Sequence, residues 1–113
     1  MNILKKYFNR IKAMKVLELG DKCRDTGEYI LAIERYNEAI TRLDQDPVDQ
    51  SYRKARIFER VAFCFEMLGD MRNREKCYGE AAENYSKIHY FENAKMCMEL
   101  RMSPGLRLVR KKM

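Results

Sequence analysis

The stretch that decides the fold reads GEYILAIERYNEAI, residues 27–40, and its pattern returns as GDMRNREKCYGEAA, residues 69–82. Four residues keep the same spacing in both copies: Gly27, Tyr36, Glu38 and Ala39 in the first, Gly69, Tyr78, Glu80 and Ala81 in the second. The two copies are offset by 42 residues, from Gly27 to Gly69. Self-similarity at a period of about 20–50 residues is typical of stacked helical units that bury their apolar faces only against neighbours. The repeat therefore predicts an all-α fold built from paired helices.

Apolar residues recur with a helical period on both sides of this stretch. The pattern predicts an α-α superhelix of about five antiparallel helices, at residues 3–25, 29–43, 47–68, 72–88 and 91–102. Gly27 is expected to end the first helix in a left-handed conformation. Asp46 and Pro47 are expected to begin the third, as an N-cap followed by proline. The helical domain then covers residues 1–102, and a basic tail covers residues 103–113.

Composition narrows the class of protein. The 113 residues include 35% charged residues but only five glycines and two prolines, which is typical of one soluble helical domain. No stretch approaches the roughly 20 apolar residues of a membrane span. Charged residues follow Met1 closely where a secretory signal would be apolar, so we expect an intracellular, cytoplasmic protein.

The net charge of +6 is unevenly distributed. Residues 1–15 carry five basic residues and no acidic one, and so do residues 101–113. Residues 16–100 hold the remaining 13 basic residues and all 17 acidic ones, which leaves 13 − 17 = −4. The chain is therefore an acidic body with two basic ends.

The residues that carry chemistry do not form a recognisable site. The four cysteines make no C-x-x-C pair and fall on or beside apolar stripes, at Cys23, Cys64, Cys77 and Cys97. We expect reduced packing residues, with a disulfide or a metal as the alternatives, and we expect no metal and no cofactor. The single histidine, His89, sits at a helix break beside aromatic residues and is expected to be a turn residue. Because no phosphate-binding loop or nucleophile motif occurs either, we expect no enzyme.

The repeat resembles the tetratricopeptide repeat, a helix pair with small residues where its helices cross. The first copy, taken from Ala13, matches at Val16, Leu19, Gly20, Cys23, Gly27, Tyr29, Ala32, Tyr36, Ala39 and Ile40. The second, taken from Ala55, matches at Phe58, Val61, Ala62, Phe65, Gly69, Met71, Tyr78 and Ala81, and departs at Arg74 where the first has Ala32. The resemblance covers roughly residues 13–98 and implies a protein-interaction module. The usual unit has about 34 residues, so the longer repeat here is closer in architecture to the extended repeats of the soluble attachment proteins of vesicle fusion.

In that family, peptides lie in a concave groove lined by the first helix of each pair. By position, the resemblance assigns the groove to Met14, Leu17, Asp21, Arg24 and Asp25 from the first copy, and to Arg56, Glu59, Arg60, Phe63, Glu66 and Met67 from the second. Members that clamp the carboxylate end of a chaperone tail carry Lys and Asn where this chain has Leu17 and Asp21, so that ligand is not expected. The mixture of Met, Phe, Arg and Glu suits an amphipathic helix or an extended segment. The alternative is that these side chains only pack or are solvated.

The sequence leaves three functions open. The leading one is an adaptor or scaffold that presents this groove to a peptide or helix of another protein. The second is electrostatic binding of nucleic acid or an anionic membrane through the basic ends, although stacking aromatics are missing at the C-terminus and the stripe Ile3, Leu4, Tyr7, Phe8 and Ile11 is expected to pack on the second helix. The third is a homo-oligomer, formed through the open end of the stack near the fifth helix.

Overall fold

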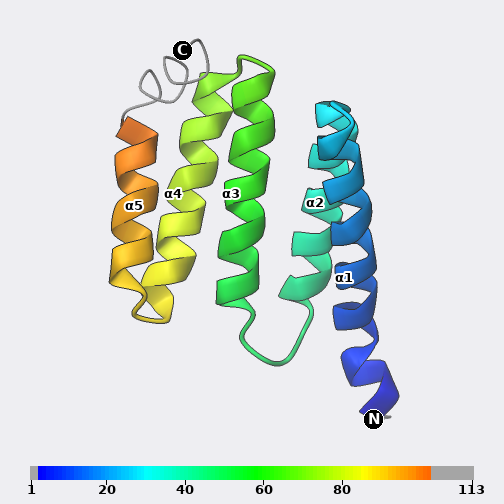
Figure 1. The fold of residues 1–113 in the computed structure, drawn as a ribbon. Coiled ribbons are helices and arrows are strands. Elements are labelled where there is room, and N and C mark those ends of the chain that lie inside the picture. The colour runs from blue at the N-terminus through cyan, green and yellow to red at the C-terminus, as the bar shows by residue number, and fades with distance from the viewer. Residues whose placement is uncertain (1–2, 103–113) are drawn as a thin grey trace.

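The structure, a computed structural model, describes residues 3–102 and is all-α, as predicted. Successive helices run antiparallel along a single row (Figure 1). Within residues 3–102 there are five helices: α1 (Ile3–Asp25), α2 (Tyr29–Asp44), α3 (Ser51–Met67), α4 (Met71–Lys87) and α5 (Phe91–Met102). The expected basic tail at residues 103–113 lies outside the described residues, as do the side chains of Ile3 and Leu4.

Three of the four connections are the same tight turn. The residue at its centre has a left-handed backbone, with φ of 81° at Gly27, 78° at Gly69 and 63° at His89. In each turn the next N–H reaches back to a carbonyl of the last helical turn: Glu28 to Cys23 at 2.8 Å, Asp70 to Phe65 at 2.9 Å and Tyr90 to Tyr85 at 2.9 Å. This is the Schellman ending of a helix, which favours glycine because glycine has no Cβ. The expected ending at Gly27 is confirmed.

The fourth connection, between α2 and α3, corrects an expectation. Asp46 does not cap α3, which begins at Ser51 rather than at Pro47. Its carboxylate accepts hydrogen bonds from the backbone N–H of Val48 at 2.9 Å and from the Nε of Arg10 at 2.7 Å. The local bond forms a turn that competes with helix, so residues 45–50 remain a loop.

The core consists of two clusters that share α3. The first joins α1, α2 and α3 and buries Ala13, Ala32, Tyr36, Ala39, Ile40, Leu43, Ile57, Val61 and Cys64. The second joins α3, α4 and α5 and buries Ala55, Ala62, Tyr78, Ala81, Ala82, Tyr85, Ala94 and Cys97. Four cysteines are free, and two of them, Cys64 and Cys97, are fully buried members of these clusters. The helices approach closely where the residues are small: a Cβ at Gly20 would lie 2.8 Å from the ring of Tyr36.

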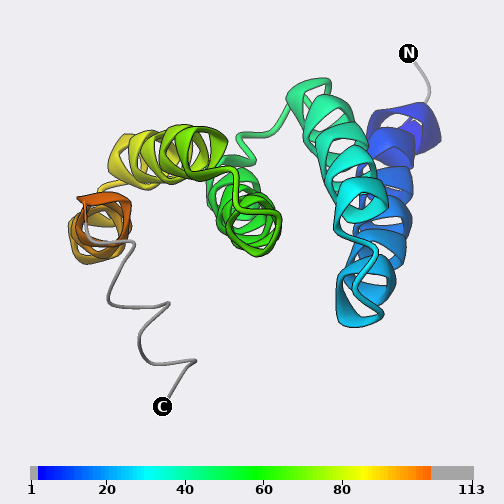
Figure 2. The same ribbon diagram turned by 90° about the horizontal axis from the view of Figure 1, so that it is seen from above.

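The row of helices bends rather than closing on itself. In Figure 2, α3 and α5 lie on the same side of α4, and the α1–α2 pair stands at the end of the row beyond the loop that leads to α3. This arrangement leaves one face of α1, α3 and α5 without a covering helix in the described part of the chain.

The N-terminal apolar stripe is exposed, where we expected it to pack on α2. The exposed fractions are 43% for Tyr7, 52% for Phe8 and 55% for Ile11. The expectation is wrong for these three residues because they share a face of α1 that does not meet α2, whereas Asn9, on the opposite face with Ala13, accepts a hydrogen bond from Arg42 of α2.

Candidate functional site

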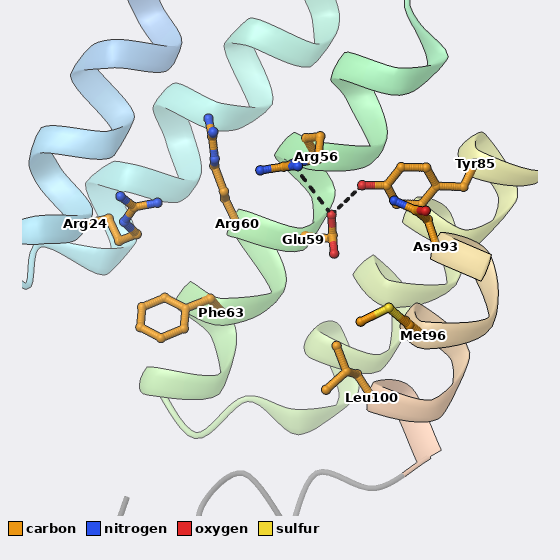
Figure 3. A pocket seen from close by; sticks show the side chains of 9 residues that line it. All are labelled: Arg24, Arg56, Glu59, Arg60, Phe63, Tyr85, Asn93, Met96 and Leu100. Carbon is orange, nitrogen blue, oxygen red and sulfur yellow. Dashed lines mark hydrogen bonds and ion pairs between the residues drawn. The ribbon is translucent and has the colours of Figure 1, made fainter. Parts of the chain in front are cut away.

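A cavity of about 500 Å³ opens between α1, α3, α4 and α5 (Figure 3). Nine residues line it: Arg24 from α1, Arg56, Glu59, Arg60 and Phe63 from α3, Tyr85 from α4, and Asn93, Met96 and Leu100 from α5. The first five are among the residues that the sequence assigned to a groove. The first cavity therefore brings together five of the eleven residues of that set, from two helices far apart in the sequence.

A second cavity, of about 290 Å³, adjoins the first along α3. It is lined by Leu17, Tyr52, Arg53, Arg56, Ile57 and Arg60. Arg56 and Arg60 line both cavities because Arg53, Arg56 and Arg60 recur at helical spacing and so share one face of α3. We call the two cavities and their lining residues the groove.

The remaining residues of the predicted set lie elsewhere. Asp21 sits behind the groove, where its carboxylate is 3.4 Å from Arg24 and 3.5 Å from Arg60. Asp25 forms an ion pair with Arg24 at 3.1 Å. Met14 is half-buried and Met67 is exposed, and neither lines the two cavities.

Glu66 is a correction to the predicted set. Its side chain is fully buried and accepts a hydrogen bond from the Nε of Arg74 at 2.7 Å. Arg74 was the one clear departure of the second copy from the repeat. A side chain without solvent exposure cannot contact a partner, so Glu66 belongs to the core and not to the groove.

Two tyrosines fix the acidic groups of the site. The hydroxyl of Tyr36 donates to Asp21 at 2.6 Å, and the hydroxyl of Tyr85 donates to Glu59 at 2.6 Å. Burial first, and then these hydrogen bonds, raise the pKa of both phenols above the ordinary value of 10.0. Both hydroxyls therefore remain protonated and hold their carboxylates in place over the physiological pH range.

Those carboxylates in turn orient the arginines. Asp21 lies between Arg24 and Arg60, and Glu59 is 4.0 Å from the Nε of Arg56. In Figure 3 the three guanidinium groups occupy the upper and left side of the cavity. Phe63, Met96 and Leu100 occupy its lower side. The first cavity thus has one cationic wall and one apolar wall.

Four lining residues were missed by the sequence-based assignment. Tyr85 is the last buried residue of α4, and Asn93, Met96 and Leu100 follow one another at helical spacing on α5. The third copy of the repeat is too weak to assign groove positions by resemblance. The spacing of the three α5 residues is the signal that identifies them, once α5 is known to begin at Phe91.

The buried thiol of Cys97 lies next to the groove residue Glu59. The thiol of Cys97 donates a weak hydrogen bond to Glu59 at 3.7 Å, and burial, with the nearby charge of Glu59, raises its pKa to about 12. This thiol remains protonated and is a poor nucleophile. Among the described residues no group of three or more His, Cys, Asp or Glu is placed to hold a metal ion.

The fold and this site define an all-α protein with an open, partly cationic and partly apolar groove. Residues 3–103 match the family described as "Uncharacterized protein conserved in bacteria (DUF2225)", and the chain belongs to that family. No curated protein and no solved structure matches it. None of the helices in residues 3–102 has the length and apolar character needed to cross a bilayer.

Proposed function

We propose that this chain is a tetratricopeptide-like interaction module, a non-enzymatic cytoplasmic adaptor or scaffold that presents its groove to a peptide or helix of a partner protein. The observation that carries the proposal is the groove itself, two adjoining cavities of about 500 and 290 Å³ lined from both ends of the helical row. Its lining of Arg, Tyr, Phe, Met and Leu combines residue types that are enriched where proteins bind one another.

The repeat supports the same proposal. Gly27 and Gly69 end equivalent helices with the same left-handed turn. Gly20 and Ala62, at equivalent positions, are both buried where helices pack. These are the packing devices of the tetratricopeptide unit, and five of the groove positions that the resemblance assigned line the first cavity.

Affinity capture from the native cell tests the proposal with two matched variants. Met96 and Met98 lie on the same helix and are exposed by 61% and 40%, but only Met96 lines the groove. We expect the wild type and Met98→Glu to recover a common protein that Met96→Glu loses, because a charge in the apolar wall excludes apolar side chains. Recovery of the same proteins by all three chains would remove the basis of the proposal.

Leu17 and Phe63 are unsuitable for this experiment. Both are partly buried and pack against the first core cluster, and Phe63 also makes an edge-to-face contact with Tyr29 at 6.2 Å between ring centroids. A charge at either position would destabilise the fold as well as the groove. Equal thermal unfolding midpoints for Met96→Glu and Met98→Glu establish that the comparison reports binding.

A second candidate is binding to an anionic membrane through the N-terminal half of α1. The exposure of Tyr7, Phe8 and Ile11 favours it, since basic and aromatic residues on one helix face are typical of interfacial binding. The Nζ of Lys12 lies 4.2 Å above the ring of Phe8, and Lys15 is exposed beside it. The basic tail, which was expected to contribute, lies outside the described residues.

Sedimentation with lipid vesicles tests this second candidate. We expect binding to vesicles that contain phosphatidylserine, no binding to pure phosphatidylcholine vesicles, and loss of binding in the variant Phe8→Ser, Ile11→Ser. Val48→Ser is the control, because Val48 is equally exposed but lies in the loop after α2. Unchanged binding by the double variant would refute an interfacial role of α1.

A further inference from the structure

We infer that the segment bound in the groove is acidic at its centre and apolar on both sides. This inference rests on the proposed function and names the chemistry of its partner. Three properties of the groove support this inference: its local charge, the hydrogen-bonding capacity that its arginines retain, and the arrangement of apolar and cationic residues along it.

The groove is a cationic region on an acidic body. The residues that line the two cavities include four arginines, Arg24, Arg53, Arg56 and Arg60, and one acidic residue, Glu59. With Asp21 and Asp25, which pair with these arginines, the net charge is 4 − 3 = +1. Residues 16–100 as a whole carry 13 basic and 17 acidic residues, so the sign of the groove opposes that of its surroundings. A local field of this kind attracts carboxylates and disfavours a basic segment.

The same argument excludes the end of this chain as the occupant. Residues 101–113 contain five basic residues and no acidic one. Placed in the groove, they would add charge of the same sign to its four arginines. Like charges at close range disfavour such a complex, so residues 101–113 are a poor occupant and we assign the acidic segment to a partner protein.

The arginines retain hydrogen-bonding capacity. Arg60 is 3.5 Å from Asp21, and Arg56 is 3.4 Å from the hydroxyl of Tyr52 and 4.0 Å from Glu59. A guanidinium has five N–H donors, and these long contacts satisfy few of them. A carboxylate that binds both N–H groups of one edge makes shorter and stronger bonds.

The arginines are also held in place before a partner arrives. Tyr36 fixes Asp21, which lies against Arg60, and Tyr85 fixes Glu59, which lies against Arg56. A side chain that is already oriented loses less rotamer entropy on binding. The tyrosines and carboxylates therefore act as positioning residues behind the groove.

The positions of apolar and cationic residues along the groove determine where the bound segment carries apolar and acidic side chains. Phe63, Met96 and Leu100 line only the first cavity, and Leu17 and Ile57 line only the second. Arg56 and Arg60 belong to both and so lie between the two apolar regions. A segment that spans the groove places carboxylates at its centre and apolar side chains towards both ends.

Synthetic peptides test the inference with the purified full chain. The first carries Glu at its centre and Leu and Phe on both sides. The second replaces Glu with Lys, the third replaces Leu and Phe with Ser, and the fourth has the composition of the first but carries Leu and Phe at its centre and Glu at both ends. We expect fluorescence anisotropy to show the tightest binding for the first peptide and at least about tenfold weaker binding for each of the others.

Arginine variants test whether the peptide binds in the groove. We expect Arg56→Gln, Arg60→Gln to weaken binding of the first peptide by about tenfold or more, and to reduce the dependence of binding on salt, because two charge-assisted contacts are lost. Arg35→Gln is the matched control, because Arg35 is a partly exposed arginine of α2 that lines neither cavity. It is expected to bind as the wild type does.

Several outcomes would overturn the inference. They are equal binding of the Lys peptide, unchanged binding by the double arginine variant, or tighter binding of a single-stranded RNA than of the acidic peptide. Its failure differs from failure of the proposed function, because the Met96→Glu and Met98→Glu captures ask only whether a protein docks against the apolar wall. A captured partner that docks through a basic or uncharged segment would leave the proposed function intact and contradict the inference.

Discussion

At the scale of single residues, the feature with the largest expected energetic effect is a buried charge pair between α3 and α4. The Nε of Arg74 donates to Glu66 at 2.7 Å, and neither side chain is exposed to solvent. The guanidinium also lies 4.8 Å above the ring of Tyr78, a cation–π contact. The equivalent residue of the first copy is Ala32, so the two copies fill the same crossing in different ways.

Removal of one partner from this pair is expected to cost more than removal of both. Glu66→Leu leaves the charge of Arg74 buried without its carboxylate and should lower the free energy of unfolding by about 3–5 kcal/mol. The double variant Glu66→Leu, Arg74→Met should recover part of this loss because no charge remains in the core. Urea unfolding followed by circular dichroism measures the four chains of the cycle, and additive losses would contradict a coupled pair.

A second residue-scale prediction concerns Asp46 and pH. Hydrogen bonds from Arg10 are the main cause that lowers the pKa of Asp46 from its usual 3.8. Because the folded-state pKa is the lower one, the ionised carboxylate contributes stability above the unfolded value, and that contribution is lost as the pH falls through the folded value. We expect the wild type to be more stable than Asp46→Asn near neutral pH, with a difference that shrinks below about pH 4.

Urea unfolding at a series of pH values measures that difference. Arg10→Gln is the control, because it removes the group that lowers the pKa and should leave a smaller pH-dependent difference from its own Asp46→Asn double variant. A gap between wild type and Asp46→Asn that stays constant with pH would contradict the assignment.

At the scale of elements, the turn between α4 and α5 has the same backbone shape as the other two tight turns although its residues differ. His89 occupies the left-handed position that Gly27 and Gly69 occupy in the other two turns, and the hydrogen bonds around it are equivalent. A residue with a Cβ is less stable in this conformation by about 1–2 kcal/mol. The end of α4 is therefore the least favourable of the three Schellman turns.

Glycine at this position is expected to stabilise the protein. His89→Gly should raise the free energy of unfolding by about 0.5–1 kcal/mol, since relief of the left-handed strain exceeds the entropic cost of glycine. The edge-to-face contact of His89 with Phe91, at 5.6 Å between centroids, is lost and limits the gain. Thermal unfolding measures the change, and Gly69→Ala is the opposite control, expected to lower stability by about 1 kcal/mol.

The bounds of the elements show what local patterns can predict. The apolar period and the left-handed glycine were sufficient for α1 and for the start of α2, because both signals act within one helix turn. They failed at the start of α3, where the Asp46 carboxylate accepts from the N–H of Val48 and forms a turn, and where Arg10, 36 positions earlier, also binds that carboxylate. They failed again at Tyr7, Phe8 and Ile11, since the apolar period does not show which face of α1 meets α2.

The residues of the candidate site also divide into those that the sequence pattern predicted and those that it did not. Of the eleven groove positions that the repeat assigned on α1 and α3, six line the two cavities, because equivalent residues of equivalent helices face the same side. Glu66 was assigned wrongly because its burial depends on Arg74, which occupies the place of a small residue in the other copy. Met96 and Leu100 were missed because α5 has no well-matched counterpart in the repeat.

At the scale of the whole molecule, the two cores predict a gradient of stability. α3 contributes to both clusters, whereas α5 buries only Ala94 and Cys97 fully. Helices with few buried contacts open locally at a lower free energy than the global transition. The groove therefore has one wall on α3, which both clusters share, and the other, through Asn93, Met96 and Leu100, on α5, which contributes to one cluster only.

Hydrogen exchange is expected to show this gradient and its response to binding. In the free protein, amides of α5 should exchange fastest among the five helices and those of α3 slowest, because local opening of α5 breaks the fewest contacts. Addition of the acidic, apolar peptide at about 100 times its Kd should slow exchange in α5 by up to about 100-fold, since the open state cannot bind and the closed state gains about 2.7 kcal/mol. Residues 37–44, the second half of α2, line neither cavity and serve as the internal reference, with no change expected. Protection confined to α2 would contradict binding of the peptide in the groove. Exchange in free α5 as slow as in α3 would show that the groove is a rigid surface rather than one completed by its ligand.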